Sequence, residues 1–163
     1  MAATNIPTGK KLLIILDCTG SMQNSIEGIK KAIFQLFSIG NLCGSNMSIQ
    51  FVLYRDYCIP RCCKWTTKIS PIMTNCYWVS AYINDINAAG GGDAPEASKT
   101  AFFKAIDLIT EDTIVFFYTD AITHDDLKNT SNGCLEAAEI GDYYFKNPLA
   151  NRIKTYYFYN QKN

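Results

Sequence analysis

The segment LLIILDCTGSM, residues Leu12–Met22, decides the fold of this chain. Its first five residues are all aliphatic and do not alternate with polar ones, which is typical of a central strand covered on both faces of a parallel sheet. The pattern then changes to a helical period that runs to about Ser38, with apolar positions on one face at Ile26, Ile29, Ile33 and Phe37. The junction is therefore a strand-to-helix turn. In open parallel sheets, such turns at the carboxyl ends of strands are where ligands bind.

Three oxygen-bearing side chains alternate along this turn, at Asp17, Thr19 and Ser21. Because they alternate, their oxygens can face one point. A carboxylate with two hydroxyls is a hard, oxygen-only donor set, which suits Mg²⁺ or Mn²⁺ better than zinc or copper. Gly20 allows the backbone to turn tightly between them. The alternative interpretation is that Asp17 and Ser21 only cap the following helix, since Asp and Ser are preferred at that position.

The composition favours one compact domain. The chain has 163 residues, of which 48% are hydrophobic, and we interpret residues 1–9 as a leader and residues 10–163 as the domain. Its 15 basic and 15 acidic side chains cancel, which argues against a nucleic-acid partner. The apolar runs have the length of strands, so no membrane partner is expected. No secretory signal is visible, so we expect a cytoplasmic protein whose seven cysteines are mostly thiols.

Strands and helices alternate along the rest of the chain. We predict strands at 47–54, 114–118 and 154–159, with a short edge strand within 65–73 that Pro71 interrupts. Helices are predicted at 75–88, from Pro95 to Ile109, and at 133–146. An aromatic and aliphatic stripe that includes Trp78 and Tyr82 in the first of these helices is usually core. The alternation predicts an α/β fold with a mainly parallel sheet.

Polar or charged residues also follow other predicted elements directly. Asp120 follows the strand at 114–118, and it can reach Asp17 only if the two strands are neighbours in a parallel sheet. Three glycines at 90–92 allow close approach to another segment, and Asp93 after them is placed to cap the next helix. Arg55 and Asp56 follow the strand at 47–54, where the usual interpretation is a surface ion pair of small energetic value.

Four cysteines in the middle of the chain invite a zinc interpretation: Cys58, Cys62, Cys63 and Cys76. Zinc ligands normally occur as two close pairs, and Cys76 has no close partner. Free thiols in a loop are therefore the favoured interpretation.

Four short motifs occur in order along nearly the whole chain: DCTGSM at Asp17–Met22, YRD at Tyr54–Asp56, GGGDAPEA at Gly90–Ala97 and TDA at Thr119–Ala121. Together they resemble the von Willebrand factor A (vWA) domain, specifically the intracellular type found with alpha-kinases. The resemblance implies a three-layer, doubly wound, Rossmann-like sheet, mainly parallel with one antiparallel edge strand. It also implies a metal-ion-dependent adhesion site (MIDAS) at the carboxyl-end crevice. The family usually continues with one more strand and a final helix. We find neither pattern after Asn160, so a fold shortened at the C-terminus is expected.

The resemblance implies a set of metal ligands. Asp17, Thr19 and Ser21 match the first metal motif, with threonine replacing its usual first serine. Asp120 matches the aspartate after the fourth main strand, which in the family binds the ion directly or through water. Asp93 stands where many adhesion-type members carry threonine. A third carboxylate would tighten metal binding and weaken the pull of the ion on an acidic partner side chain.

We therefore expect a metal-ion-dependent protein-interaction (adaptor) module that is not an enzyme. Its ligands would hold Mg²⁺, with Mn²⁺ or Ca²⁺ as alternatives, and would leave a position for water or for an acidic side chain of a protein partner. An unpaired sheet edge would also offer a surface for self-association. Two alternatives stay open, a Mg²⁺-dependent phosphotransferase or phosphatase with Asp17 as nucleophile and a structural scaffold with an empty site.

Overall fold

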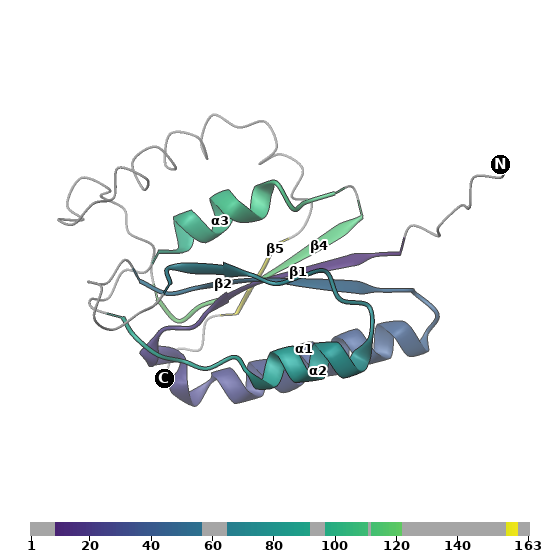
Figure 1. The fold of residues 1–163 in the computed structure, drawn as a ribbon, viewed down its shortest axis with the longest axis horizontal. Coiled ribbons are helices and arrows are strands. Elements are labelled where there is room, and N and C mark those ends of the chain that lie inside the picture. Colours follow the sequence, from purple (N-terminus) through teal and green to yellow (C-terminus); the bar gives the residue numbers. More distant parts are fainter. Residues whose placement is uncertain (1–8, 57–64, 92–96, 111, 122–155, 160–163) are drawn as a thin grey trace.

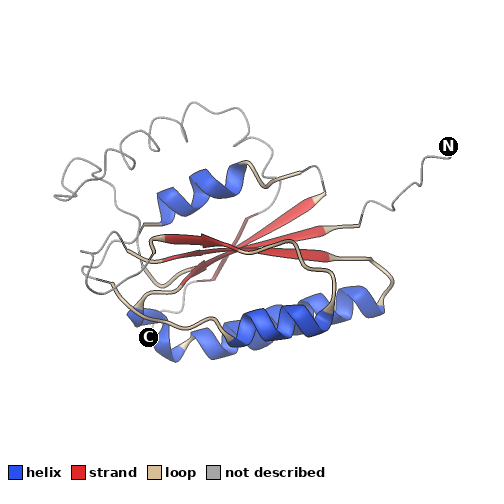
Figure 2. Cartoon of the chain, in the orientation of Figure 1, coloured by secondary structure: helices blue, strands red, loops and turns tan. Residues whose placement is uncertain are grey.

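A mixed five-stranded sheet lies between two layers of helices in the computed structural model, which describes residues 9–56, 65–91, 97–110, 112–121 and 156–159. Helices α1 and α2 cover one face and α3 covers the other (Figure 1; Figure 2). The elements are β1 (Lys11–Asp17), the 3₁₀ helix η1 (Gly20–Asn24), α1 (Ile26–Leu42), β2 (Ser48–Tyr54), β3 (Thr67–Ile69), α2 (Cys76–Asn84), α3 (Ser98–Ile106), β4 (Thr113–Tyr118) and β5 (Tyr156–Tyr159).

The sheet order is β3-β2-β1-β4-β5, with β1 in the centre. β1 pairs in parallel with β2 and with β4, and β4 pairs in parallel with β5. β3 runs antiparallel to β2 at one edge. These pairings confirm the predicted doubly wound, mainly parallel sheet with one antiparallel edge strand.

The side chains of β1 divide between two cores because successive residues of a strand point to opposite faces. Leu12, Ile14 and Leu16 pack with the apolar side of α1, whereas Leu13 and Ile15 pack with α3. All seven residues of β1 are buried, as the unbroken aliphatic run predicted. Burial of each such side chain stabilises the fold by about 1.5–3 kcal/mol. The central strand is therefore fixed from both sides, and its carboxyl end is a rigid support.

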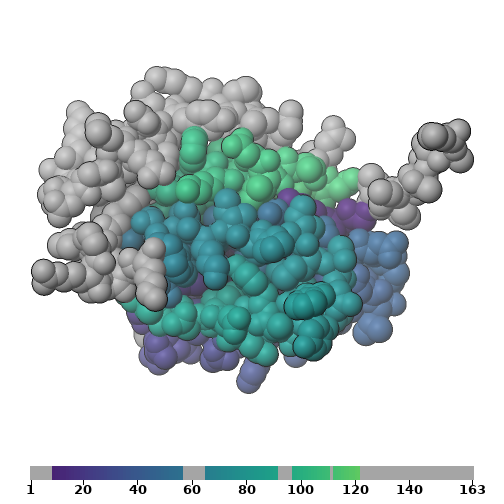
Figure 3. All heavy atoms as spheres, viewed as in Figure 1, coloured from purple at the N-terminus to yellow at the C-terminus, as the bar shows by residue number. Residues whose placement is uncertain are grey.

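The predicted helical face at Ile26, Ile29, Ile33 and Phe37 is buried, which confirms the period. α1 continues to Leu42 and is thus longer than expected. The core prediction for α2 is wrong at Trp78, whose side chain is 63% exposed. Val79 and Ile83 already fill the inner side of α2, so Trp78 faces outward. In the space-filling view, the teal residues of the 65–91 segment fill the centre of the face turned to the viewer (Figure 3).

Several predictions fall outside the described residues. They are the helix at 133–146, the helix start at Pro95, and residues 1–8 of the predicted leader at 1–9. Most of the C-terminal region, on which the expected shortening depends, is also outside. The domain boundaries at 9 and 10 therefore stay a prediction. α3 is described from Ser98, with Ala97 at its cap position. Among the helices that the structure describes, none combines the length and the apolar character that crossing a bilayer requires.

Candidate metal centre

β1 and β4 bring their polar ends to the same edge of the sheet. The two strands are parallel neighbours, and Leu16 lies opposite Tyr118 in their register. Asp17 therefore lies beside the turn that begins at Thr119 and Asp120. The sequence analysis required the two strands to be parallel neighbours if their ends were to meet. This requirement is confirmed.

Both carboxylate oxygens of Asp17 accept hydrogen bonds. Oδ1 accepts from the Thr19 backbone N–H at 2.9 Å and from the Thr19 hydroxyl at 2.7 Å. Oδ2 accepts from the Thr119 hydroxyl at 2.8 Å and from the Tyr54 hydroxyl at a longer 3.4 Å. The carboxylate is thus oriented by groups from the ends of three neighbouring strands.

The network continues from Thr19 to the surface. Thr19 Oγ1 and Ser21 Oγ lie 3.1 Å apart, and Ser21 Oγ donates to Asp120 Oδ1 at 2.9 Å. Of the predicted ligands, the structure therefore brings together Asp17, Thr19, Ser21 and Asp120. The fifth, Asp93, lies outside the described residues.

The site runs from the protein interior to solvent. Asp17 and Thr19 are buried, with Asp17 at 0% exposure, whereas Ser21 and Asp120 are exposed. Burial raises the pKa of Asp17 above its usual value, and the negative charge of Asp120 adds to this. Hydrogen bonds from Thr19 and Thr119 oppose the increase. An ionised carboxylate in such a place is costly without a cationic partner, which a metal ion supplies.

The capping alternative is not what the structure shows. The cap position of α1 is Ser25, and no side-chain hydrogen bond caps that helix. The 3₁₀ helix η1 likewise has Thr19 at its cap position without a side-chain cap bond. Asp17 and Ser21 are instead bonded across the sheet edge to residues after β4.

The glycine-rich segment after α2 packs on the β1 turn. Gly20 N–H donates to Gly90 O at 2.8 Å, and Ala89 N–H donates to Cys18 O at 2.9 Å. Gly90 and Gly91 have φ values of 80° and 101°, in the left-handed region that favours glycine. The close approach predicted for these glycines is therefore to the turn that carries the candidate ligands.

The surface-pair interpretation of Arg55 and Asp56 is wrong, because the two residues are only 7% and 4% exposed. The Arg55 guanidinium donates to Cys18 O at 3.3 Å and to Asn87, and it lies 4.2 Å from the centre of the Trp65 ring. The end of β2 is covered by the two loops at the site, so the arginine points inward to their carbonyls rather than to solvent.

Sequence reasoning missed three residues at the site, which are Thr119, Arg55 and Tyr54, the last of which donates to Asp17 Oδ2. Thr119 directly follows β4 as Asp17 closes β1, so its place at a strand end was an available signal. The contacts of Arg55 depend on which loops cover β2, and a charged residue at a strand end does not reveal that.

The oxygen set fits a hard divalent cation. It contains two carboxylates and the hydroxyls of Thr19, Ser21 and Thr119, without nitrogen or sulfur, which is the donor chemistry of Mg²⁺. The described parts of the chain hold no cluster of three or more His, Cys, Asp or Glu side chains suited to a metal ion. Cys76 is a free, exposed thiol, and the other cysteines of the zinc interpretation, Cys58, Cys62 and Cys63, fall in the undescribed segment.

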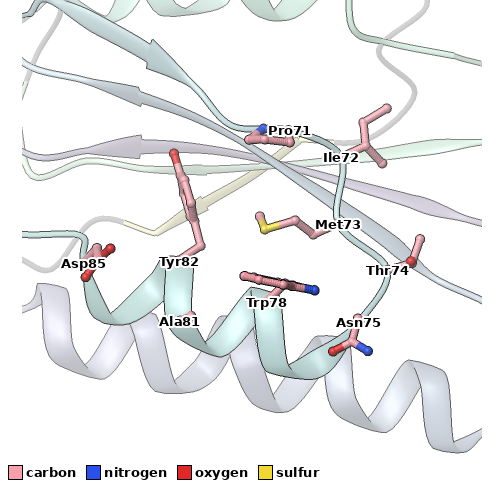
Figure 4. A pocket seen from close by; sticks show the side chains of 9 residues that line it. All are labelled: Pro71, Ile72, Met73, Thr74, Asn75, Trp78, Ala81, Tyr82 and Asp85. Carbon is pink, nitrogen blue, oxygen red and sulfur yellow. The ribbon is translucent and has the colours of Figure 1, made fainter.

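A separate apolar pocket of about 480 Å³ lies between α2 and the chain that leads into it. Figure 4 shows Trp78 and Tyr82 on α2 with Met73 nearby on the connecting segment. Its lining includes none of the residues of the hydrogen-bonded network described above. The pocket is therefore distinct from the candidate metal centre.

The fold and the site together define a Rossmann-like α/β domain with an oxygen-only site at the ends of its central parallel strands. A sequence profile described as the von Willebrand factor A domain matches residues 11–137, and the chain belongs to this family. The predicted resemblance is thus confirmed.

Two curated proteins share sequence with the chain. One is the ariadne-like RING finger protein R811 of Acanthamoeba polyphaga mimivirus, 34% identical over 116 residues that cover 69% of this chain and 11% of that protein. The other is the alpha-protein kinase vwkA of Dictyostelium discoideum, 35% identical over 89 residues that cover 52% and 13%. The chain therefore spans only a small part of the length of these relatives.

Solved structures share the fold at low sequence identity. BatB from Bacteroides thetaiotaomicron has a TM-score of 0.61 and 16% identity, over 93% of this chain and 66% of that one. The pilus adhesin SpaC from Lactobacillus rhamnosus GG, in its open conformation, has a TM-score of 0.55 and 11% identity, over 69% and 14%. These likenesses establish the architecture alone.

Proposed function

We propose that this vWA domain is a metal-ion-dependent protein-interaction module without enzymatic activity. Domains of the family commonly act as protein-interaction modules. The observation that carries the proposal is the continuous network from buried Asp17 through Thr19 and Ser21 to exposed Asp120. These four residues, with Asp93 as a further ligand, would hold Mg²⁺, with Mn²⁺ or Ca²⁺ as alternatives.

The exposure of the outer ligands supports a role in partner binding. Mg²⁺ keeps several waters in a site of about six oxygens, so one water can be exchanged for a carboxylate oxygen of a partner protein. Ser21 and Asp120 are exposed, so an ion bound beside them would be open to such a partner. The compartment proposed is the cytoplasm, and an unpaired edge of the sheet is proposed as the surface for self-association.

The phosphotransferase alternative has less support. A nucleophilic carboxylate must reach the phosphorus atom of its substrate, whereas Asp17 is 0% exposed and both of its oxygens accept hydrogen bonds. Its raised pKa reflects burial rather than an activating base. Asp17 is therefore poorly placed to attack a phosphoester.

Thermal unfolding in EDTA, Mg²⁺, Mn²⁺ and Ca²⁺ tests metal binding. A ligand that binds only the folded state stabilises it by about 2.7 kcal/mol at 100 times its dissociation constant, so the melting temperature rises. The rise is expected in the wild type and should be lost in Asp17→Ala and in Asp120→Ala. Asp120 is exposed, so its variant stays folded even if Asp17→Ala does not.

Asp107→Ala is the matched control, because Asp107 is an exposed carboxylate next to Leu108, whose carbonyl accepts a hydrogen bond from Lys11 at the opposite end of β1 from the site. It should keep the full metal response. If no ion raises the melting temperature of the wild type, the metal-dependent function is wrong and the scaffold alternative stands. If a metal response is present, binding of Glu-containing peptides in Mg²⁺ but not in EDTA tests the interaction itself.

A further inference from the structure

The Arg55 side chain joins the two loops at the candidate metal centre. Its Nε–H donates to Cys18 O at 3.3 Å. Its Nη2 donates to the backbone and side-chain oxygens of Asn87, at 3.3 and 3.4 Å. Cys18 lies between the ligands Asp17 and Thr19 in the chain, and Asn87 begins the segment that reaches Gly90. A single planar guanidinium thus spans the ligand turn and the glycine loop.

The same two loops are also held by backbone hydrogen bonds. Ala89 N–H donates to Cys18 O, the acceptor that Arg55 shares, and Gly20 N–H donates to Gly90 O. Arg55 is only 7% exposed, and its guanidinium carbon lies 4.2 Å from the centre of the Trp65 ring. Stacking on an indole fixes the plane of the guanidinium and so its donor directions.

If only its charge acted, Arg55 would weaken the binding of a metal ion. A permanent positive charge close to a cation site repels the cation, and the repulsion is stronger where water is excluded. Removing the charge should then tighten metal binding. A contribution of Arg55 to metal binding must therefore come from the geometry of its hydrogen bonds, and the sign of the effect separates the two explanations.

We propose that Arg55 is a positioning residue that holds the Cys18 turn and the Asn87–Gly90 loop together and thereby sets the geometry of the metal ligands. The inference rests on the proposed metal-binding function. Residues that orient metal ligands from behind typically change affinity by about 10- to 100-fold when they are replaced. An effect of this size is expected here because Arg55 acts on the backbone between Asp17 and Thr19.

Calorimetric titration with Mg²⁺ and Mn²⁺, well below the melting temperature, compares the wild type with Arg55→Met and Arg55→Lys. Arg55→Met should bind the ions about 10- to 100-fold more weakly. Arg55→Lys keeps the charge but has a point-like ammonium that cannot reproduce the fork, so its affinity should also fall. Tighter binding in Arg55→Met, or wild-type affinity in both variants, overturns the proposal.

Lys11→Met is the matched control. Lys11 is also a buried cation with a side-chain hydrogen bond to a carbonyl, Leu108 O at 2.7 Å, but it lies at the opposite end of β1. Its replacement should lower stability and leave metal affinity unchanged. An equal loss of metal affinity in Lys11→Met would assign the effect of Arg55 to general stability and overturn the proposal.

A metal-free measurement separates failure of this inference from failure of the proposed function. In EDTA, amide hydrogen exchange by NMR reports the loop contacts through the Gly20 and Ala89 amides. Arg55→Met should speed exchange at these two amides relative to those of the β1–β4 ladder, and Lys11→Met should not. Unchanged protection in Arg55→Met overturns the positioning role whether or not the wild type binds metal.

Discussion

The Ser21 hydroxyl donates a hydrogen bond to Asp120 Oδ1 at 2.9 Å, although 99 residues separate the two in the chain. Ser21 follows the central strand β1, and Asp120 follows its neighbour β4. Both side chains are exposed, so their contact lies at the mouth of the network that ends at buried Asp17. The pair is therefore the solvent-facing end of the network, where the proposed metal ion and partner would bind.

The first prediction concerns this exposed pair. Ser21→Ala and Asp120→Asn should each weaken Mg²⁺ binding at least about tenfold, the effect typical of disturbing a metal site. Each should change the free energy of unfolding in EDTA by no more than about 0.5 kcal/mol, because both residues are at the surface. Calorimetric titration and urea unfolding measure the two quantities. Strong destabilisation with unchanged metal affinity would assign the pair to the fold and not to the site.

The second prediction uses the raised pKa of Asp17. Burial, with the negative charge of Asp120, raises this pKa above 3.8 despite the hydrogen bonds from Thr19 and Thr119. The folded protein therefore keeps the Asp17 proton to higher pH than the unfolded chain does. As pH rises from the unfolded value through the raised folded value, the contribution of Asp17 to the free energy of unfolding falls, and above that window it stays low.

Urea unfolding in EDTA across this pH window checks the sign. Asn cannot ionise, so the difference in free energy of unfolding, wild type minus Asp17→Asn, should decrease as pH rises. Taking the difference removes the contribution of the other carboxylates. A difference that is flat, or that grows with pH, would contradict the raised pKa.

The third prediction concerns thiol reactivity. Burial raises the pKa of the Cys18 thiol to about 12, and its side chain is fully buried. Because the thiolate is the reactive form, Cys18 should resist iodoacetamide at pH 8, whereas the exposed thiols of Cys43 and Cys76 should react. Peptide mapping by mass spectrometry distinguishes the three. Urea should expose Cys18, and its rapid alkylation in the folded protein would contradict this placement.

The fourth prediction compares two glycines of opposite role. Gly28 lies in α1 with open space where a Cβ would be, so Gly28→Ala should raise the free energy of unfolding by about 0.5–1 kcal/mol. Gly90 has φ of 80°, and Gly90→Ala should lower it by about 1–2 kcal/mol. Urea unfolding in EDTA measures both. Equal stabilisation by the two substitutions would contradict the prediction, because it would mean that alanine adopts the left-handed conformation of Gly90 at no cost.

Gly90→Ala should also weaken metal binding, since Gly90 O accepts from Gly20 within the ligand turn. Gly28→Ala should leave metal affinity unchanged and serves as its control. The two substitutions add the same methyl group, so a difference in metal affinity between the two variants reports the loop contact.

The amino-acid sequence by itself determined the elements and the chemistry of the candidate ligands. The aliphatic run before Asp17 specified a strand buried on both faces, and the apolar period from Ile26 to Phe37 specified the face that α1 buries. Such patterns are local, because a strand repeats every two residues and a helix every 3.6. Thr19 and Ser21 were predicted as ligands for the same reason, since they alternate within the same turn.

Only the tertiary structure decided which distant residues meet. The sheet order places Asp120 beside Ser21, brings Thr119 to the carboxylate of Asp17, and turns Arg55 inward to two loops rather than out to solvent. No local period encodes the neighbours of a strand, because they depend on how the whole chain packs its apolar faces. For this reason the sequence could specify the ligand types at the end of β1 but not the hydrogen-bonded network that joins them to the rest of the site.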